Sequence, residues 1–507
     1  MVNTHGIGKP VFVPERRSQI PRLVREAFDL LRETVEASAL AFLDAPDRLE
    51  FLRLEESVLQ AFGVMSSHVV AGLMGMLHRN GAWVEEATAE ERRRSSVPLR
   101  HRGWRSTPVR FLSGARLNLD TPYLSEDLTA RPGPTRGVGR RGKNGSGRYP
   151  ALEALGVLHR ATPALASEVT RQSVRTASLD EARQALAERG IRITKETVRN
   201  LTLKVGQEAL RQREARADLA ERQVVLSNEF SGQRVVISTD GGRIRMREGG
   251  QRGRKRKSGR RRYRTPWREP KLVTAYLVDK KGRKKRDALP VYDGTLEDAD
   301  AAFKILATEL KLRGAAQAKE IVLVADGARW IWNRADELAR FLGIDPSRIV
   351  KVADFYHAVE HLSDIADLRA GWSDHQRKRW VRRMRRKLRN GKVDDVIEEA
   401  NGFCVGRNAK KILKEVNYFA DRREFMQYAD FARRGIPLGS GGVESAIRRV
   451  VNLRLKGPSI FWRKGNAECM LHLRSYLKAG RWDELMRRVM HRSPDGKPAA
   501  SALSQAA

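Results

Sequence analysis

Two apolar runs of the sequence end in an Asp-Gly pair, and a carboxylate in that position can do metal-ion chemistry. The run 235–238 leads to Asp240, and the run 321–325 leads to Asp326. Strands of an α/β sheet place ligands at their carboxyl ends. If these two strands are neighbours, their carboxylates converge and repel each other unless a divalent cation lies between them. Oxygen ligands favour Mg²⁺, so the pair predicts a magnesium site.

A site for two metal ions needs a third acid, and the sequence offers two candidates. Glu444 lies in the first turn of an expected helix that follows the Gly-rich run 437–442. It could instead complement the helix dipole or pair with Arg448 four residues later. The rival is Glu269, at the start of the second expected strand. The pattern of residues leaves both open.

A different metal chemistry has to be weighed at residues 357–361. His357, Glu360 and His361 fit the H-x-x-E-H pattern of zinc peptidases. On a helix the two histidines would lie on one face, as zinc requires. A peptidase needs a further ligand downstream and has no use for a large positive charge. We therefore disfavour this alternative.

The acids must be positioned by a sheet, and the C-terminal half of the chain has the pattern of one. Strands are expected at 235–238, 271–278, 289–292, 321–325 and 348–353, and helices at 297–312, 328–342 and from 358 to about 431. The order β-β-β-α-β-α-β followed by helices is typical of a ribonuclease-H-like sheet, with three antiparallel strands first. With strand order 3-2-1-4-5, the strands that carry Asp240 and Asp326 are neighbours.

The N-terminal half favours helices and one small hairpin. Apolar residues recur at helical spacing over 17–80, and they alternate with polar residues over 106–123. Residues 178–205 are typical of a helix-turn-helix. Ser178 begins a capping box, and Gly190 ends the first helix before a short turn. This is the signature of a DNA-binding unit, although an ordinary helical hairpin has the same pattern.

The segment 130–150 is rich in Gly, Pro and Arg, and we predict a basic linker there. Gly137, Gly139 and Gly142 fit a phosphate-binding G-x-G-x-x-G loop. Such a loop needs a buried strand before it, so that backbone amides converge on the phosphate. The preceding residues are polar and contain two prolines, which excludes that strand.

The charge of the chain makes polyanions its default partner. Lys and Arg number 98 against 61 Asp and Glu, a net charge of +37. Nucleic acid is the first expectation and an anionic membrane a distant second. No stretch approaches 18 uninterrupted apolar residues, so we expect no membrane-spanning helix. Two cysteines and no apolar leader over residues 1–16 favour the cytosol.

Basic residues with interleaved aromatics mark the expected DNA contacts, because Arg and Lys bind phosphates while Trp stacks on unpaired bases. Two tracts stand out, 252–268 and 377–389, and a solvated basic face is the alternative for each. The predicted contact residues are Arg254, Lys255, Arg256, Lys257, Arg261, Trp267, Arg377, Lys378, Trp380, Arg448 and Arg449.

Four short motifs carry a resemblance to a known family. In chain order they lie at 238–242, 324–332, 354–362 and 439–445. With them the chain resembles a DDE transposase of the bacterial insertion-sequence type, most of all the Kra-type family, which is related to Mutator-like transposases. The resemblance covers residues 150–480 well. It implies a ribonuclease-H-like domain with a helical insertion before its last acid.

The resemblance also implies roles for particular residues. Matched by position, the triad is Asp240, Asp326 and Glu444, and these residues would hold the metal ions. Asp354 and His357 match an Asp-x-x-His element of the family. Relatives often carry a cysteine-containing zinc module upstream, whereas this chain has no cysteine before residue 404.

These observations predict a fold class and a domain organisation. We expect an α/β ribonuclease-H-like catalytic domain with a mixed five-stranded sheet and an all-α insertion, after a mainly α N-terminal DNA-binding region. The expected parts are a helical region with a small hairpin (1–130), a linker (131–150), a helix-turn-helix region (151–230), a catalytic core (231–357), a helical insertion (358–436), the rest of the core (437–490) and a disordered tail (491–507).

The function that follows is DNA transposition by an enzyme. Metal-dependent cleavage and strand transfer would use two Mg²⁺ ions, with Mn²⁺ as a substitute. Expected partners are double-stranded DNA and further copies of the chain, with no membrane, in the bacterial cytoplasm at the nucleoid. A non-catalytic DNA-binding protein derived from a transposase and a structure-selective nuclease are the alternatives.

Overall fold

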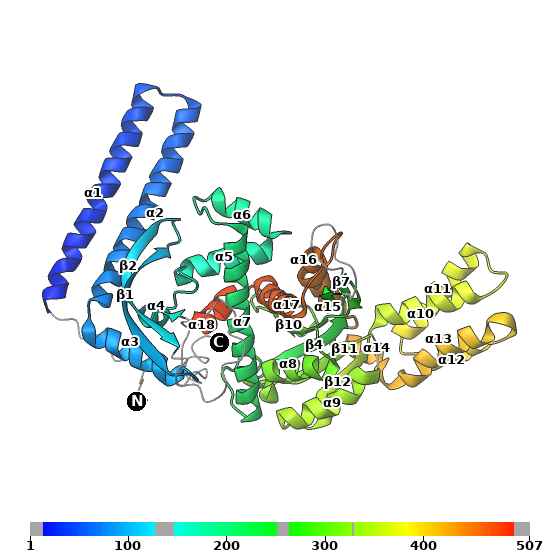
Figure 1. The fold of residues 1–507 in the computed structure, drawn as a ribbon. Coiled ribbons are helices and arrows are strands. Elements are labelled where there is room, and N and C mark those ends of the chain that lie inside the picture. The colour runs from blue at the N-terminus through cyan, green and yellow to red at the C-terminus, as the bar shows by residue number, and fades with distance from the viewer. Residues whose placement is uncertain (1–13, 127–146, 251–262, 327–328, 491–507) are drawn as a thin grey trace. The chain divides into compact units, whose positions relative to one another are not determined.

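The computed structural model describes residues 14–126, 147–250, 263–326 and 329–490 (Figure 1). The predicted tail 491–507 and linker residues 131–146, including the three linker glycines, lie outside them. The chain divides into two compact units: unit 1 comprises residues 1–208 and 486–502, and unit 2 comprises residues 209–485 and 503–507.

Unit 1 begins with two long antiparallel helices, as the periodicity over 17–80 predicted (Figure 1). These are α1 (Pro14–Asp44) and α2 (Arg48–His78), and α3 (Gly81–Arg94) follows. The Asp47 carboxylate starts α2 by accepting hydrogen bonds from Leu49 N and Glu50 N, both at 2.7 Å. A cap of this kind satisfies N–H groups that have no partner within the helix.

Helix α2 departs from one expectation. By length and composition it is apolar enough to cross a membrane, because residues 57–78 contain no Asp, Glu, Lys or Arg. Only 22% of its most apolar window is buried. The helix contains no long uninterrupted apolar run, since Ser, Gln and His residues lie among its apolar ones. A single helix of this kind is weak evidence of a membrane protein, because core helices of soluble proteins share the pattern.

The predicted hairpin is present and longer than expected. Strands β1 (Leu99–Arg110) and β2 (Arg116–Glu126) pair antiparallel, and β3 (Gly147–Arg148) extends the sheet. Gly114 in the connecting turn has φ +88°, and a Cβ there would lie 2.2 Å from the Gly190 carbonyl oxygen. Only glycine permits this close approach between the hairpin turn and the helix-turn-helix.

The helix-turn-helix region is helical at the predicted places. Its helices are α4 (Pro150–Ala154), α5 (Pro163–Arg175), α6 (Leu179–Ala187) and α7 (Lys195–Glu221). Ser178 Oγ accepts from Glu181 N at 3.1 Å, which is the predicted cap. The second helix does not end near residue 205 but continues to Glu221, because buried Ala209 and Ala220 extend its apolar face.

Unit 2 is built on a mixed five-stranded sheet. Its strands are β4 (Arg234–Gly241), β9 (Lys271–Val278), β10 (Val291–Thr295), β11 (Glu320–Ala325) and β12 (Ile349–Ala353). Their order is β10-β9-β4-β11-β12, which is the predicted order 3-2-1-4-5. The first three strands along the chain pair antiparallel, and β11 lies parallel to both β4 and β12. The strands that lead to Asp240 and Asp326 are therefore neighbours.

Helices cover both faces of this sheet. One apolar core lies between the sheet and α8 (Ala299–Leu312) with α9 (Arg329–Leu342), and another between the sheet and α10 (Phe355–Leu368). The second core continues into the helices that follow α10. Two small ladders were not foreseen: β5 (Ile244–Arg245) with β8 (Trp267–Arg268), and β6 (Glu248–Gly250) with β7 (Tyr263–Arg264).

The segment after β12 is helical to the end of the described chain. The predicted insertion contains α11 (Asp374–Arg389), α12 (Val393–Asn401), α13 (Ala409–Asp421) and α14 (Tyr428–Arg433), and after it come α15 (Gly441–Ile447), α16 (Leu453–Leu455), α17 (Lys464–Ala479) and α18 (Trp482–Met490). A π-helical turn, Arg448–Asn452, joins α15 to α16. Short 3₁₀ turns lie at Ala315–Gln317, Pro346–Arg348, Gly406–Asn408 and Arg423–Phe425.

Candidate functional site

Asp240 and Asp326 lie at the same edge of the sheet. Asp240 is near the end of β4, and Asp326 directly follows β11, the parallel neighbour of β4. Asp240 is half-buried, and its Oδ1 accepts a hydrogen bond from Gly241 N at 2.7 Å. Asp326 is exposed. Parallel strands end at the same edge, so the fold places these two acids as the sequence predicted.

The causes of the raised pKa of Asp240 indicate which other acids lie close to it. The pKa of Asp240 is raised from 3.8 to about 6, mainly by burial; the charges of Asp326, Glu444 and Glu269 contribute to the rise, and the hydrogen bond from Gly241 N–H opposes it. Each of these carboxylates disfavours a negative charge on Asp240. The structure thus gathers the three predicted acids and the rival third acid into one cluster.

Glu269 is held against the backbone of β4. A Cβ at Gly241 would lie 2.0 Å from Glu269 Oε1, so a side chain there would displace that carboxylate. The Glu269 side chain is 60% exposed, and its Oε2 lies 3.9 Å from Lys271 Nζ. Surface ion pairs of this geometry contribute little. Glu269 remains available to a cation as much as Glu444 does.

Glu444 is tied to the core through Ser440, which the sequence analysis did not single out. The buried Asp354 caps α10: its Oδ1 accepts from Tyr356 N at 2.6 Å and His357 N at 3.2 Å. Its Oδ2 accepts from Ser440 N at 2.7 Å and also contacts Ser440 Oγ. That same hydroxyl lies 3.0 Å from Glu444 Oε1.

The Ser440 hydroxyl has a single proton and lies within hydrogen-bond reach of two carboxylates, those of Asp354 and Glu444. A hydroxyl donates one hydrogen bond at a time. The hydroxyl oxygen lies closer to Asp354 Oδ2 than to Glu444 Oε1, and it can donate to either carboxylate, so Ser440 bridges the two acids. Ser440 therefore links Glu444, the third predicted acid, to the buried Asp354. The signal in the sequence was the Gly-Ser-Gly-Gly entry to the helix.

The two histidines of the H-x-x-E-H pattern have separate partners. His357 Nδ1 lies 2.9 Å from Glu360 Oε2, and His361 Nδ1 lies 2.6 Å from Glu415 Oε2 on α13. Within the described residues, His361, Asp364 and Glu415 form a group whose ligand atoms lie within 4.8 Å of one another. Glu360 is not part of that group.

A cavity of about 650 Å³ opens beside Asp326, between α10 and α13. His357, His361 and Tyr418 line it. The His361 ring stacks on Tyr418 at 3.7 Å between centroids, and Tyr418 Oη donates to the Asp326 carbonyl oxygen at 3.1 Å. His357 therefore lies on a wall shared with Asp326, in keeping with a supporting position.

The predicted DNA contacts have different environments. Arg254, Lys255, Arg256, Lys257 and Arg261 lie outside the described residues. Trp267 is 47% exposed, with the Arg245 guanidinium 4.8 Å from its ring centroid. Lys378 and Arg448 are exposed. Arg377 is half-buried near Asp374, and Arg449 donates to Tyr292 Oη at 2.8 Å.

Trp380 corrects one prediction. Its side chain is 4% exposed and packs near Trp372 and Phe403, and its Nε1 donates to Glu399 at 2.8 Å. A buried ring cannot stack on a base. Trp380 is part of the core of the insertion, and only the basic residues of its helix remain available to DNA.

Comparisons with known proteins add little to this geometry. No family model matches the chain, and no curated protein matches it. A solved structure, the Drosophila P element transposase strand transfer complex, is similar at 11% identity and a TM-score of 0.22. The similarity covers 63% of this chain and 80% of that chain. At such a TM-score it carries no argument about fold or function.

Proposed function

We propose that this chain is a DDE-type DNA transposase that cleaves and joins the ends of an insertion sequence. The observation that carries the proposal is that Asp240 and Asp326 end neighbouring parallel strands, with Glu444 close enough to contribute, after burial, to the raised pKa of Asp240. Clustered carboxylates with perturbed pKa values at the carboxyl edge of a sheet are typical of catalytic sites.

The donor set suits the proposed metal ions. It consists of carboxylate oxygens, the ligands that Mg²⁺ and Mn²⁺ prefer, and their mutual repulsion would be offset by cations. Asp240, Asp326 and Glu444 would hold two Mg²⁺. When bound, such ions supply an activated nucleophile and stabilise the leaving oxygen of an in-line displacement.

The chain's own residues have defined tasks in this proposal. The Gly241 N–H holds Asp240 Oδ1 in place, and Ser440 would link Glu444 to Asp354. Asp354 anchors both the start of α10 and Ser440, so it acts as a positioning residue. The imidazole of His357 would donate a hydrogen bond to a phosphate near the scissile bond.

The assignment to a fold and a family rests on the order of the strands in the sheet and on the four sequence motifs. The strand order with a helical insertion before Glu444 suits a ribonuclease-H-like catalytic domain, and the four motifs suit the Kra-type family. Double-stranded DNA would be the substrate, held by a multimer of the chain in the bacterial cytoplasm. The charge of +37 supports a polyanionic substrate.

The test compares four matched variants: Asp240→Asn, Asp326→Asn, Glu444→Gln and Glu269→Gln. We expect the first three to lose cleavage and strand joining while duplex binding persists, because they remove ligands and not phosphate contacts. Glu269→Gln is the control. The assay uses a labelled duplex from the flanks of the reading frame, with Mg²⁺ or with EDTA.

Each outcome has one meaning. An active Glu444→Gln beside an inactive Glu269→Gln would transfer the role of third ligand to Glu269. Cleavage without joining would make the chain a nuclease. Full activity in EDTA, or in Asp326→Asn, would refute the metal-dependent DDE mechanism.

A further inference from the structure

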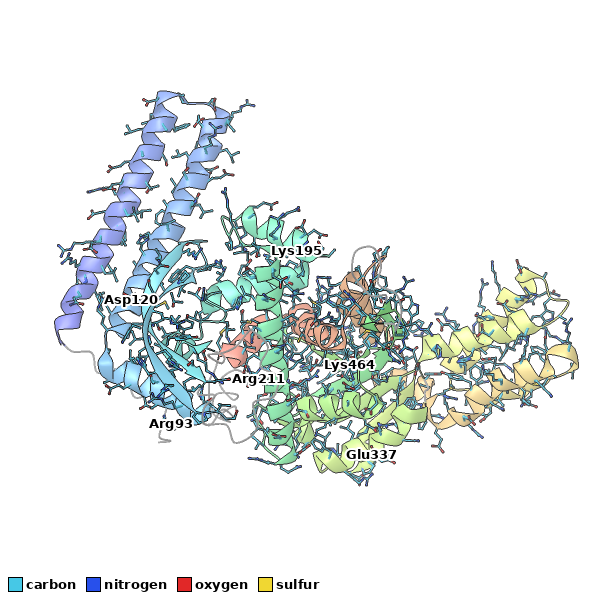
Figure 2. All side chains as sticks on the ribbon, viewed as in Figure 1. Arg93, Asp120, Lys195, Arg211, Glu337 and Lys464 are labelled. Carbon is cyan, nitrogen blue, oxygen red and sulfur yellow. The ribbon has the colours of Figure 1, made fainter. Side chains whose placement is uncertain are left out.

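Unit 1 contains a cavity of about 610 Å³ that no predicted role uses. It is lined by residues of the β1–β2 hairpin, of β3 and α4, of the loop between α4 and α5, and of the first turn of α7. Helix α7 begins at Lys195, which is labelled in Figure 2. Arg110, Arg116 and Arg160 are on its wall, and Thr197 faces it from α7. The cavity therefore adjoins the second helix of the predicted helix-turn-helix.

Among the described residues that line this cavity, positive charge predominates. Within the part of the chain that the structure describes, Arg110, Arg116 and Arg160 have no salt bridge. Glu153 is the one acid among the lining residues. Desolvation lowers the pKa of His159, and the nearby cations Lys204, Arg160 and Arg110 lower it further. Such a concentration of positive charge attracts anions.

The backbone that presents these side chains adopts an unusual conformation. His159 and Arg160 have φ values of +49° and +64°. They form the two central residues of a tight turn closed by Leu158 N to Ala161 O at 3.0 Å and Ala161 N to Leu158 O at 2.9 Å. Two-residue turns with positive φ at both positions favour Asn-Gly, since side chains disfavour this region.

Strand β1 holds the turn in place. Arg110 N donates to Arg160 O at 2.8 Å, and Thr162 N donates to Arg110 O at 3.0 Å. These backbone hydrogen bonds hold Arg110 and Arg160, which carry two of the guanidinium groups, next to each other. Unfavourable backbone conformations that the surrounding structure enforces cluster at ligand sites. Glycine at position 160 would relieve the backbone strain of the turn, yet the chain has arginine there.

We propose that this cavity binds the phosphate backbone of duplex DNA, as a contact beside the helix-turn-helix. The inference rests on the proposed function, which supplies DNA as the substrate. Guanidinium groups donate paired hydrogen bonds that match phosphate oxygens. Contacts of this kind orient a protein on the duplex and carry no sequence information. The residues assigned to the contact are Arg110, Arg116 and Arg160.

The decisive variant replaces the turn with the residues its geometry favours, His159→Asn with Arg160→Gly. We expect a higher thermal midpoint, because the strain is relieved. We also expect binding of a short fluorescein-labelled duplex to weaken about eightfold at 0.1 M salt, the effect of one lost phosphate contact. The full chain is used in EDTA, so that no cleavage occurs, and binding is followed by anisotropy.

Two single variants extend the test. Arg116→Gln should weaken binding and lower the slope of log K against log salt by about 0.9, whatever the DNA sequence. Arg100→Gln is the matched control, since Arg100 is an exposed arginine of the same hairpin outside the cavity. Its affinity and slope should equal those of the unmodified chain.

The results separate the two proposals. Unchanged DNA affinity in the turn variant and in Arg116→Gln would overturn the phosphate contact and leave the proposed function standing. If the unmodified chain binds no DNA at all, the proposed function itself fails.

Discussion

Asp240 lies at the end of β4, where burial and three neighbouring carboxylates all disfavour its charge. The raised pKa, about 6, means that the ionised form costs folding free energy at neutral pH when no cation is present. A site that must attract cations gains from this arrangement, because the repulsion is relieved on binding. Asp240 should therefore lower the stability of the metal-free protein.

Asp240→Asn should stabilise the protein in EDTA. A shift from 3.8 to about 6 is discounted for partial exposure to about 1–2 kcal/mol of unfolding free energy well above pH 6. Because the folded pKa is raised, the penalty of the aspartate falls as pH drops through 6, and it is absent near 3.8. Urea denaturation across this range measures the gain, and a gain that is independent of pH would contradict the assignment.

At the scale of elements, α11 shows how one helix serves two environments. Trp380, Met384 and Leu388 are buried at spacing i, i+4, i+8, while Arg382, Arg385 and other basic residues of the same helix are exposed. The buried stripe belongs to the core that joins the insertion to the sheet. The exposed basic residues of α11 remain available to a phosphate backbone.

Trp380→Ala should destabilise the insertion by about 3–5 kcal/mol, because a large buried ring is lost. Trp380→Phe should cost less, roughly 1 kcal/mol beyond the packing change, through the lost hydrogen bond to Glu399. Denaturant unfolding measures both. DNA affinity of the folded Trp380→Phe protein should be unchanged, and a marked loss would mean that the indole contacts DNA after all.

At the scale of the whole molecule, the dominant property is the charge of +37. If the chain binds duplex DNA as proposed, it would release counterions, and its affinity would fall steeply with salt. The tract 254–257 lies in the connection from β4 to β9, between strands that pair beside Asp240. Its position in the chain links the charge to the candidate site.

Neutralising Arg254, Lys255, Arg256 and Lys257 together should weaken binding for all sequences and lower the salt slope by up to about 0.9 per phosphate contact. The control removes equal charge at exposed residues near the opposite edge of the sheet: Lys280, Lys281, Arg286 and Lys319. Anisotropy titrations at several salt concentrations compare the two. Equal slopes would mean that total charge, and not this tract, sets the binding.

Much of the fold could be predicted from local patterns in the sequence. Apolar runs that end in Asp-Gly predicted β4 and β11, and the capping residue Ser178 predicted the start of α6. Helical spacing predicted α1 and α2, and the order of elements predicted the sequence of strands in the sheet. These features depend on hydrogen bonds and burial over a few neighbouring residues, so a single sequence contains them.

Only the tertiary structure decided which side chains meet. It turned Trp380 inward, gave Glu444 a partner in Ser440, and kept Glu269 beside Asp240 as a rival. It also placed Arg110 next to the turn at Arg160. The direction of a side chain depends on neighbours that are distant in the chain, and burial and charge act through those neighbours. No local pattern carries that information.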